Sequence, residues 1–308
     1  MKVVVAIDSF KGSLTSIEAG MAAKEGILKA HPDANVVVKP LADGGEGTTD
    51  ALIAGLGGER IDLTVTGPLG TPVNAHYGYL AEKNTAILEM AAAAGIILVR
   101  ESEKNPLTVT TYGVGEMIAD AMERGIRNFI IGIGGSATND GGIGMAAGLG
   151  YEFFDKNNHL LQAKGISLDR VARISADNVP AILENLDIQI LTDVTNPLCG
   201  ENGATYVFGG QKGLPALLFS QVDQAMVTFY KQANPTIFSL AGAGAGGGMA
   251  AGLVTFAHGK IVSGIDTCLN LLDFDNRVKR ADLVIVGEGR MDQQSLAGKA
   301  PIGVARRT

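Results

Sequence analysis

Acidic residues follow four apolar segments of this chain, and they are the side chains best placed to do chemistry. They are Asp8, Asp43 with Glu46, Asp193, and Glu288 with Asp292. In open α/β sheets, ligands bind outside the carboxyl ends of the strands, which is where these acids fall. Lys11, Arg290 and Lys299 stand beside them in the sequence. Carboxylates that hold magnesium, with cations that bind phosphate oxygens, are the parts that phosphoryl transfer needs.

Each of these acids also has an ordinary structural alternative. An aspartate at a strand end can simply hydrogen-bond a loop or cap a helix. One such acid alone is therefore weak evidence of a site. Because four loops share the pattern, we expect at least two of them to meet.

Two glycine-rich segments, 129–150 and 242–252, could bring backbone N–H groups close to a phosphate. The candidate phosphate contacts are Gly134, Gly135, Ser136, Thr138, Asn139, Gly244, Gly246 and Gly247. Both segments also match the dinucleotide-binding fingerprint, so the match is not specific. Asp155, the acid that such a fingerprint would need, opens a hairpin-like Asp-Lys-Asn-Asn turn, which argues against a nicotinamide cofactor. For segment 242–252, close helix packing on a sheet is an equal alternative.

Composition narrows the class of protein. The chain has 308 residues, of which 46% are hydrophobic and 19% charged, enough for two domains with a sizeable core. The net charge of −7 argues against nucleic acid or an anionic membrane surface as the main partner. The cysteines and histidines show no metal-ligand spacing, and no apolar run is long enough to span a membrane. We expect a cytoplasmic protein with a small-molecule substrate.

The elements that must position these residues alternate between strands and helices. Strands are predicted at 3–7 and 36–39, each followed by a helix, which is the pattern of a parallel sheet. After Gly67 the pattern changes to an antiparallel pair, and residues 151–162 form a predicted hairpin.

We therefore predict an α/β fold with two α/β domains. A Rossmann- or flavodoxin-like parallel-sheet domain, residues 1–65 plus 260–308, is interrupted by a second, mixed-sheet domain, residues 66–259. The last predicted helix, 300–308, leads into no further strand, so we expect the native protein to be longer.

Six motifs, in order, resemble the bacterial glycerate kinase family of the glycerate 2-kinase type. They are DSFKGSLTS at 8–16, PLADGGEGT at 40–48, IGIGGSATNDGG at 131–142, LTDVTNPLCGENGA at 191–204, GAGAGGGMAAG at 242–252 and GEGRMDQQSLAGKAP at 287–301. The resemblance implies phosphorylation of D-glycerate by ATP with Mg²⁺, more commonly to the 2-phosphate than the 3-phosphate, in a cleft between two α/β domains. Family members run longer than this chain. The oligomeric state stays open between monomer and homodimer.

Within that reaction we assign roles to the candidate residues. Asp193 is the hypothetical base near the acceptor hydroxyl, with Asp8 beside it. Asp43 and Glu46 are the metal candidates, and Asp8 could also reach the magnesium. Cations for the carboxylate or the transferred phosphate are Lys11 and Arg290. The remaining candidate substrate contacts are Ser9, Asp292 and Lys299. Two alternatives stay open: a nicotinamide-dependent oxidoreductase and a non-catalytic nucleotide- or metabolite-binding protein.

Overall fold

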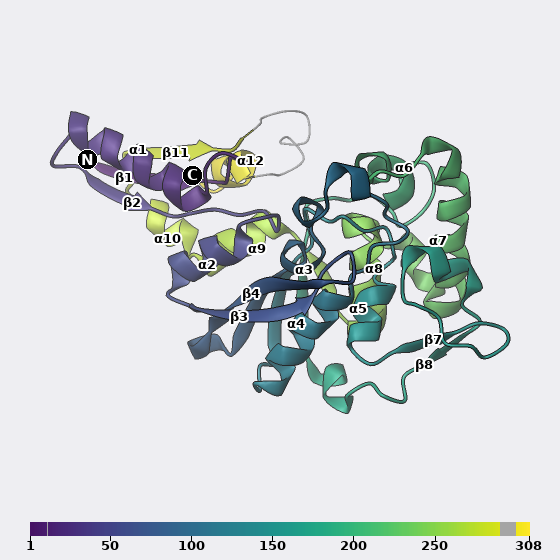
Figure 1. Cartoon of the computed structure of the whole chain (residues 1–308). Coiled ribbons are helices and arrows are strands. Elements are labelled where there is room, and N and C mark those ends of the chain that lie inside the picture. Colours follow the sequence, from purple (N-terminus) through teal and green to yellow (C-terminus); the bar gives the residue numbers. More distant parts are fainter. Residues whose placement is uncertain (11, 290–299) are drawn as a thin grey trace.

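The computed structural model describes residues 1–10, 12–289 and 300–308 and has an α/β architecture (Figure 1). The strands are β1 (Lys2–Ile7), β2 (Asn35–Val38), β3 (Glu59–Thr66), β4 (Pro72–Leu80), β5 (Thr85–Glu89), β6 (Asn128–Gly132), β7 (Glu152–Phe154), β8 (Arg173–Ser175), β9 (Asp187–Leu191), β10 (Lys260–Val262) and β11 (Leu283–Gly287). Four predicted site residues lie outside the described residues, and their roles stay predictions: Lys11, Arg290, Asp292 and Lys299.

Helices alternate with strands in the first part of the chain, as expected from the sequence, and after α2 several strands or several helices follow one another. The helices are α1 (Ser16–Ala30), α2 (Thr48–Leu56), α3 (Ala91–Ala94), α4 (Tyr112–Glu123), α5 (Ile143–Gly148), α6 (Ala204–Phe208), α7 (Phe219–Ala233), α8 (Ala245–Ala257), α9 (Gly264–Leu271), α10 (Phe274–Val278) and α12 (Ala300–Ala305). No helix in the described ranges is both long enough and apolar enough to cross a membrane.

A small parallel sheet at one end of the molecule has the order β11-β1-β2. Its central strand alternates between two faces, because successive side chains of a strand point to opposite sides. Val3 and Val5 pack with the apolar side of α1, whereas Val4 and Ala6 belong to a second core on the other face. The start of α1 is fixed by a capping box: the Thr15 hydroxyl accepts from the Glu18 N–H, and the Glu18 carboxylate accepts from the Thr15 N–H.

A larger mixed sheet has the order β10-β9-β6-β5-β4-β3. Strands β10, β9, β6 and β5 run parallel, and β4 and β3 complete the sheet in antiparallel pairing. A tight turn joins β3 to β4, and its Gly67 N–H donates to the Thr71 carbonyl at 2.7 Å. The predicted change from parallel to antiparallel pairing after Gly67 is therefore confirmed.

Helices α2, α9 and α10 lie between the two sheets (Figure 1). One buried cluster contains Val4 of the small sheet, Leu52 of α2, Leu269 of α9 and Ile87 of the large sheet. This shared apolar core fixes the two sheets relative to one another. The opposite face of the large sheet packs on α4 and α8, where Met117 and Leu253 are fully buried. The order of layers is thus helix, sheet, helix, sheet, helix.

The predicted α/β fold class is confirmed, but two local expectations need correction. The hairpin expected over 151–162 is reduced to a single bridge between Phe154 and Leu160, and the ladder partner of β7 is β8. The Asp155 turn itself forms, with the Asp155 N–H donating to the His159 carbonyl. A local turn signal could not show that the longer-range partner at 173–175 supplies most of the pairing.

Sheet membership also differs from the predicted boundaries. Strands β3 and β10 belong to the large sheet, although residues 59–65 and 260–262 were expected in the first domain. A boundary at residue 65 would cut the β3–β4 hairpin, whose strands pair from Glu59–Tyr79 to Thr66–Pro72. The division into domains stays a prediction, now with β3 and β10 on the larger side.

Candidate active site

Loops that follow the parallel strands of both sheets meet in the interior of the molecule. The loop after β2 touches the end of β6, where the Gly134 N–H donates to the Gly44 carbonyl at 3.2 Å. A Cβ atom on Gly44 would lie 2.8 Å from the Cβ atom of Leu191 at the end of β9. The Asp43 carbonyl also packs against Gly264, the first residue of α9. The loop 43–47 is therefore the segment that joins the two sheets at their carboxyl ends.

Three of the predicted acids, Asp8, Asp43 and Asp193, are close enough to the buried thiol of Cys268 to act on its pKa. After burial itself, the negative charges of Asp43, Asp8 and Asp193 raise the pKa of Cys268. Asp43 also raises the pKa of Asp193. The structure thus brings together residues that are up to 185 positions apart in the chain (193 − 8).

Asp193 is held at the N-terminus of α9. Its Oδ1 accepts from the Ser263 hydroxyl at 2.9 Å and from the Gly264 N–H at 3.0 Å, and its Oδ2 accepts from the Ile265 N–H at 3.2 Å. Burial raises the pKa of this half-buried carboxyl, while these hydrogen bonds oppose the rise. A carboxylate whose proton affinity is increased and whose position is fixed suits a base, and the same contacts suit a helix cap.

The other acids of this region lie at different places. Asp43 Oδ1 accepts from the Gly45 N–H at 3.0 Å and so shapes its own loop. Glu46 is exposed and lines a large cleft. Glu89, which ends β5, accepts from the Gly47 and Thr49 N–H groups at 3.0 and 2.6 Å. Burial raises the pKa of Glu89. Glu89 was not among the predicted site residues, although it ends a buried strand as the predicted acids do.

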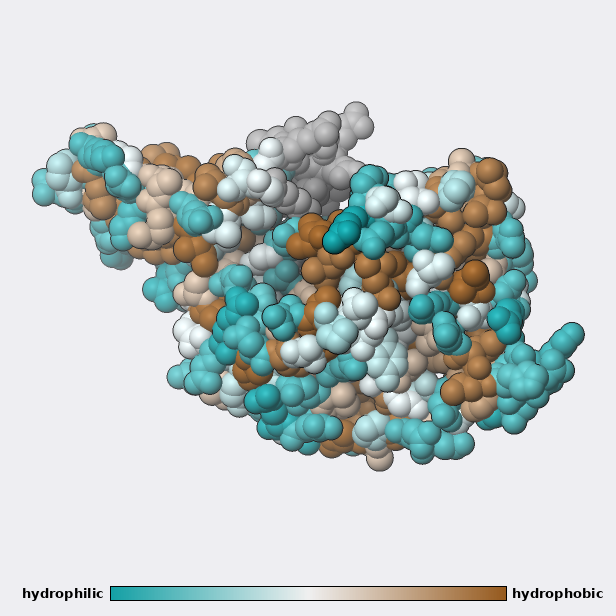
Figure 2. Space-filling view, viewed as in Figure 1, coloured by the Kyte–Doolittle hydropathy of each residue, from teal (hydrophilic) through white to brown (hydrophobic). Residues whose placement is uncertain are grey.

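Two hollows open in this part of the molecule, and the loop 43–47 lines the larger one. The larger cleft, of about 720 Å³, is lined by residues of the loop after β1, by Glu46 and Gly47, and by the segment 89–98. The smaller hollow, of about 350 Å³, is lined by Asp193, Thr195, Ser263, Asp266 and Arg306. Figure 2 shows the surface hollowed between the end of the molecule that carries α1 and the body that carries the large sheet. Ser9 lines the larger cleft, and Asp193 lines the smaller hollow.

The two glycine-rich segments pack against each other. A Cβ atom on Gly142 would lie 2.8 Å from the Cα atom of Gly252, and Gly247 meets the Thr138 carbonyl even more closely. Gly247 also has a φ of +72°, which favours glycine. Gly244, Gly247, Thr138 and Asn139 are buried, whereas Gly135 is exposed and Gly134 and Gly246 are half-buried. Close packing thus explains the buried glycines, and phosphate contact stays a prediction that fits Gly134, Gly135 and Gly246 best.

Beneath this turn lies a buried polar network. Asp140 is fully buried, and its Oδ2 accepts from the Thr111 N–H at 3.0 Å and hydroxyl at 2.8 Å, while its Oδ1 accepts from the Gly142 N–H at 3.0 Å. Burial raises the pKa of Asp140. The Asn139 amide donates to the Thr205 hydroxyl at 2.9 Å. The polar residues in the glycine turn therefore partly support the turn itself.

Lys212 is a buried cation that the sequence analysis did not identify. It is 3% exposed, and its Nζ donates to the Ser136 hydroxyl at 2.7 Å and to the Thr138 carbonyl at 2.6 Å. Burial lowers its pKa to about 7, and the charge of Asp140 opposes that shift. Lys212 ends a short 3₁₀ turn, Gly210–Lys212, and no local sequence signal connects it to Ser136.

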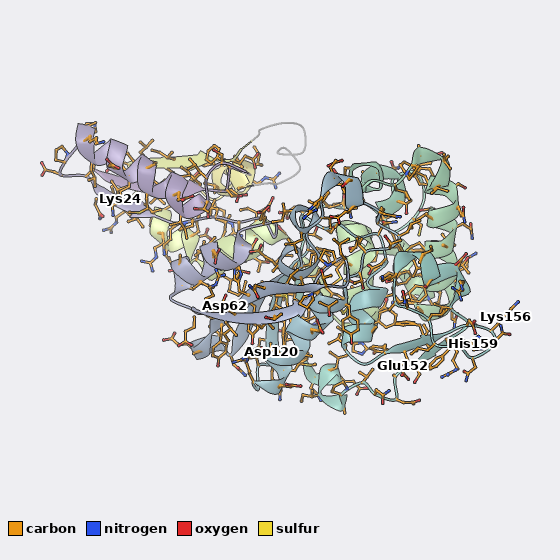
Figure 3. All side chains as sticks on the ribbon, in the orientation of Figure 1. Lys24, Asp62, Asp120, Glu152, Lys156 and His159 are labelled. Atoms are coloured by element: carbon orange, nitrogen blue, oxygen red, sulfur yellow. The ribbon has the colours of Figure 1, made fainter. Side chains whose placement is uncertain are left out.

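Other polar groups lie outside this region. The charged and polar residues labelled in Figure 3 lie on peripheral elements of the molecule: Lys24, Asp62, Asp120, Glu152, Lys156 and His159. Burial raises the pKa of Cys199 to about 12, so its thiol stays protonated. Asp155 accepts from the Asn157 and His159 N–H groups, which is a turn contact.

The model of the glycerate kinase family matches residues 3–308. The chain belongs to the glycerate kinase family. A glycerate kinase from Neisseria meningitidis is 49% identical over 308 residues, which are 100% of this chain and 82% of that protein. A glycerate 2-kinase from Escherichia coli is 43% identical over 309 residues, covering 99% of this chain and 81% of that protein. A crystal structure described as glycerate kinase 2 from Salmonella typhimurium superposes with a TM-score of 0.89 at 41% identity, covering 100% and 83% of the two chains.

Proposed function

We propose that this protein transfers a phosphate group from ATP to D-glycerate, with the 2-hydroxyl as the acceptor. Membership of the glycerate kinase family over residues 3–308 carries the proposal, and the relative named glycerate 2-kinase supports the position of transfer. The convergence of three carboxylates at the ends of parallel strands is in keeping with phosphoryl transfer.

The two hollows suit two substrates of different size. The cleft of about 720 Å³ is large enough for a nucleotide, and its apolar residues Phe10, Ile53 and Leu98 could cover a base. The hollow of about 350 Å³ suits a three-carbon hydroxy acid, and it offers the Arg306 cation beside the Thr195 and Ser263 hydroxyls. We assign ATP to the larger cleft and glycerate to the smaller hollow, with the loop 43–47 between them.

Asp193 is the proposed base for the glycerate hydroxyl. It lines the smaller hollow, and three donors of α9 and its cap fix its carboxylate. A carboxylate within hydrogen-bond reach of the hydroxyl would orient it and accept its proton as the phosphate transfers. The raised pKa of Asp193 increases its affinity for that proton.

The acids fit a magnesium ion held in the way typical of kinases. Mg²⁺ prefers oxygen ligands and is usually bound by one or two carboxylates, with phosphate oxygens and water completing the octahedron. No group of three or more His, Cys, Asp or Glu in ligand geometry occurs within 1–10, 12–289 and 300–308. One oxygen of Asp43 has no described partner, since only its Oδ1 accepts, from Gly45. We propose that Asp43 holds the ion with Asp8 or Glu46. Bound Mg²⁺ would neutralise charge on the phosphates.

A coupled assay for ADP release tests the proposal directly. We expect ADP release from ATP to depend on D-glycerate and on Mg²⁺, and ³¹P NMR to identify 2-phosphoglycerate. D-lactate lacks the 3-hydroxyl and 3-hydroxypropionate lacks the 2-hydroxyl, so phosphorylation of only D-lactate would support the 2-position. ADP release that is independent of D-glycerate would refute the proposed substrate.

A further inference from the structure

The turn at Gly135–Ser136 holds several hydrogen-bond donors that have no acceptor among the residues that the structure describes. The Ser136 hydroxyl accepts from Lys212, so its own O–H is available to donate, and no described residue takes that proton. In the described ranges, the backbone N–H groups of Gly135 and Ser136 likewise have no acceptor, although their neighbours Gly134 and Ala137 donate to Gly44 and Ala94. Next to them, the Thr138 hydroxyl and Asn139 Oδ1 are buried with no partner from the described parts of the chain. A group of unpaired donors at one turn is the chemistry of an anion site.

Lys212 brings a positive charge to this turn without an ion-pair partner among the described residues. Lys212 forms no salt bridge with any acid of the described chain; its two bonds go to the Ser136 hydroxyl and the Thr138 carbonyl. Asp140 is near enough to favour the charged ammonium, but its own carboxylate is taken up by Thr111 and Gly142. A buried cation without a counterion is costly, and an anion bound beside it removes that cost.

The turn adjoins the lining of the larger cleft. Gly135 is exposed, and Ser136 retains 8% exposure. A Cβ atom on Gly135 would lie 3.3 Å from the Cβ atom of Ala91, and Ala91 lines the larger cleft. Gly135 also has a φ of +72°, the left-handed conformation that turns successive N–H groups toward one side in anion-binding nests.

We propose that Lys212, the Ser136 hydroxyl and the N–H groups of Gly135 and Ser136 bind a phosphate group of the nucleotide, with Lys212 as the cation of the site. The inference rests on the proposed kinase function for the identity of the ligand, but the site itself is defined by the donors. Lys212 reaches Ser136 across 76 positions of sequence, so this cation joins the glycine turn only in the fold.

Binding of inorganic tripolyphosphate, measured by calorimetry without magnesium, tests the site apart from turnover. Lys212→Met keeps the length of the side chain and removes its charge, and we expect tripolyphosphate and ADP to bind about 10- to 150-fold more weakly, as loss of a charged hydrogen bond predicts. Adenosine affinity should not change. Lys212→Arg should restore part of the loss. Lys104→Met is the matched control, because the Lys104 ammonium pairs with Glu101 at 2.6 Å; it should bind as the wild type does.

A second variant covers the case in which Lys212→Met fails to fold. Ser136→Asp gives the ammonium a carboxylate partner and so occupies the anion site from within; we expect an unchanged or higher melting temperature with tripolyphosphate binding abolished.

In the wild type, tripolyphosphate binding near pH 8 should take up as much as about one proton, and calorimetry in buffers of different ionisation enthalpy detects that uptake. Tripolyphosphate binding at wild-type strength by Lys212→Met or Ser136→Asp would overturn the proposal. D-glycerate displacing tripolyphosphate from this site would assign it to the acceptor carboxylate and also overturn it. Absence of glycerate-dependent ADP release would refute the kinase function while leaving the phosphate site intact.

Discussion

Replacement of Asp193 by Asn should separate catalysis from stability. The Asn side-chain carbonyl can still accept from the Ser263 hydroxyl and the Gly264 N–H. The Asn NH₂ group replaces the carboxylate oxygen that accepts from the Ile265 N–H at 3.2 Å, so that N–H loses its acceptor. Loss of one such bond costs about 1 kcal/mol. Loss of the negative charge at the start of α9 costs about 0.3–1 kcal/mol more. Because burial already disfavours the charged carboxyl of Asp193 and raises its pKa, a neutral side chain recovers part of this loss. We expect the free energy of unfolding to fall by less than about 2 kcal/mol.

The effect on turnover should be much larger if Asp193 is the base. A positioned general base contributes about 10²–10⁴-fold, so we expect kcat with D-glycerate to fall at least about 100-fold, with the KM for ATP nearly unchanged. Steady-state kinetics and urea unfolding, measured on the same preparation, give both quantities.

Asp266→Asn is the matched control for this experiment. Asp266 lies in the first turn of the same helix and lines the same hollow, but its side chain is 58% exposed and pairs with Arg307 at 2.8 Å. An exposed pair contributes about 0–1 kcal/mol, so stability should change little and kcat should stay near that of the wild type. A kcat for Asp193→Asn within about tenfold of the wild type, below the range of a general base, would refute the catalytic assignment. Recovery of activity on cooling would assign Asp193 to helix capping.

Three further predictions follow from buried contacts. The pKa of Lys212 falls from 10.5 to about 7 in the fold, so the unfolded chain binds more protons than the native state between these pH values. The free energy of unfolding of the wild type relative to Lys212→Met should therefore rise from pH 7 to 9, by up to about 1.4 kcal/mol per pH unit. Urea unfolding measures this difference, and a difference that does not change with pH would contradict the prediction. Gly142→Ala should lower the free energy of unfolding by about 1–3 kcal/mol more than Gly57→Ala does. Both glycines have a positive φ, but only a Cβ atom on Gly142 would face a backbone atom, the Cα of Gly252, at 2.8 Å. Equal melting temperatures of the two variants would refute the packing argument. Glu89→Gln leaves one of two N–H groups at the start of α2 without its acceptor. The free energy of unfolding should therefore fall by about 1–3 kcal/mol, and the KM for ATP should rise. An unchanged KM would show that Glu89 does not support the nucleotide cleft.

Much of the framework could be predicted from sequence because it depends on local chemistry. The alternation of Val3, Val4 and Val5 between two cores follows from the period of a strand. The capping box at Thr15 and Glu18 needs only four consecutive residues. The nearness of Asp8 and Asp43 followed from one rule of topology, namely that parallel strands bring their carboxyl ends to one edge. Asp193 follows a strand of the other sheet, so its approach to them depends on how the two sheets pack.

Other contacts could not be predicted because both partners must first be placed by the fold. A glycine pattern shows that the backbone approaches something closely, but not whether that is a phosphate or another backbone. Gly247 meets the Thr138 carbonyl, whereas Gly135 is exposed and lies next to Ala91 of the cleft lining. The pairing of β7 with β8 depends on a strand that begins 19 residues after β7 ends (173 − 154), beyond the turn that suggested a nearer partner. Lys212 reaches Ser136 from a short turn that has no recognisable motif.

The loop 43–47 is held in place by contacts with three other parts of the molecule. Its Gly44 carbonyl is held by the Gly134 N–H, its Gly47 N–H is held by Glu89, and its Asp43 carbonyl packs on α9. The proposed nucleotide cleft lies on the Gly47 side, and the proposed glycerate hollow lies on the α9 side. Phosphate oxygens held at one side and a hydroxyl held at the other must therefore approach each other past a backbone that is fixed at three points. Such a fixed path lowers the entropic cost of bringing the reacting atoms into line, so the glycines that allow this close packing would contribute to catalysis even where they touch no ligand.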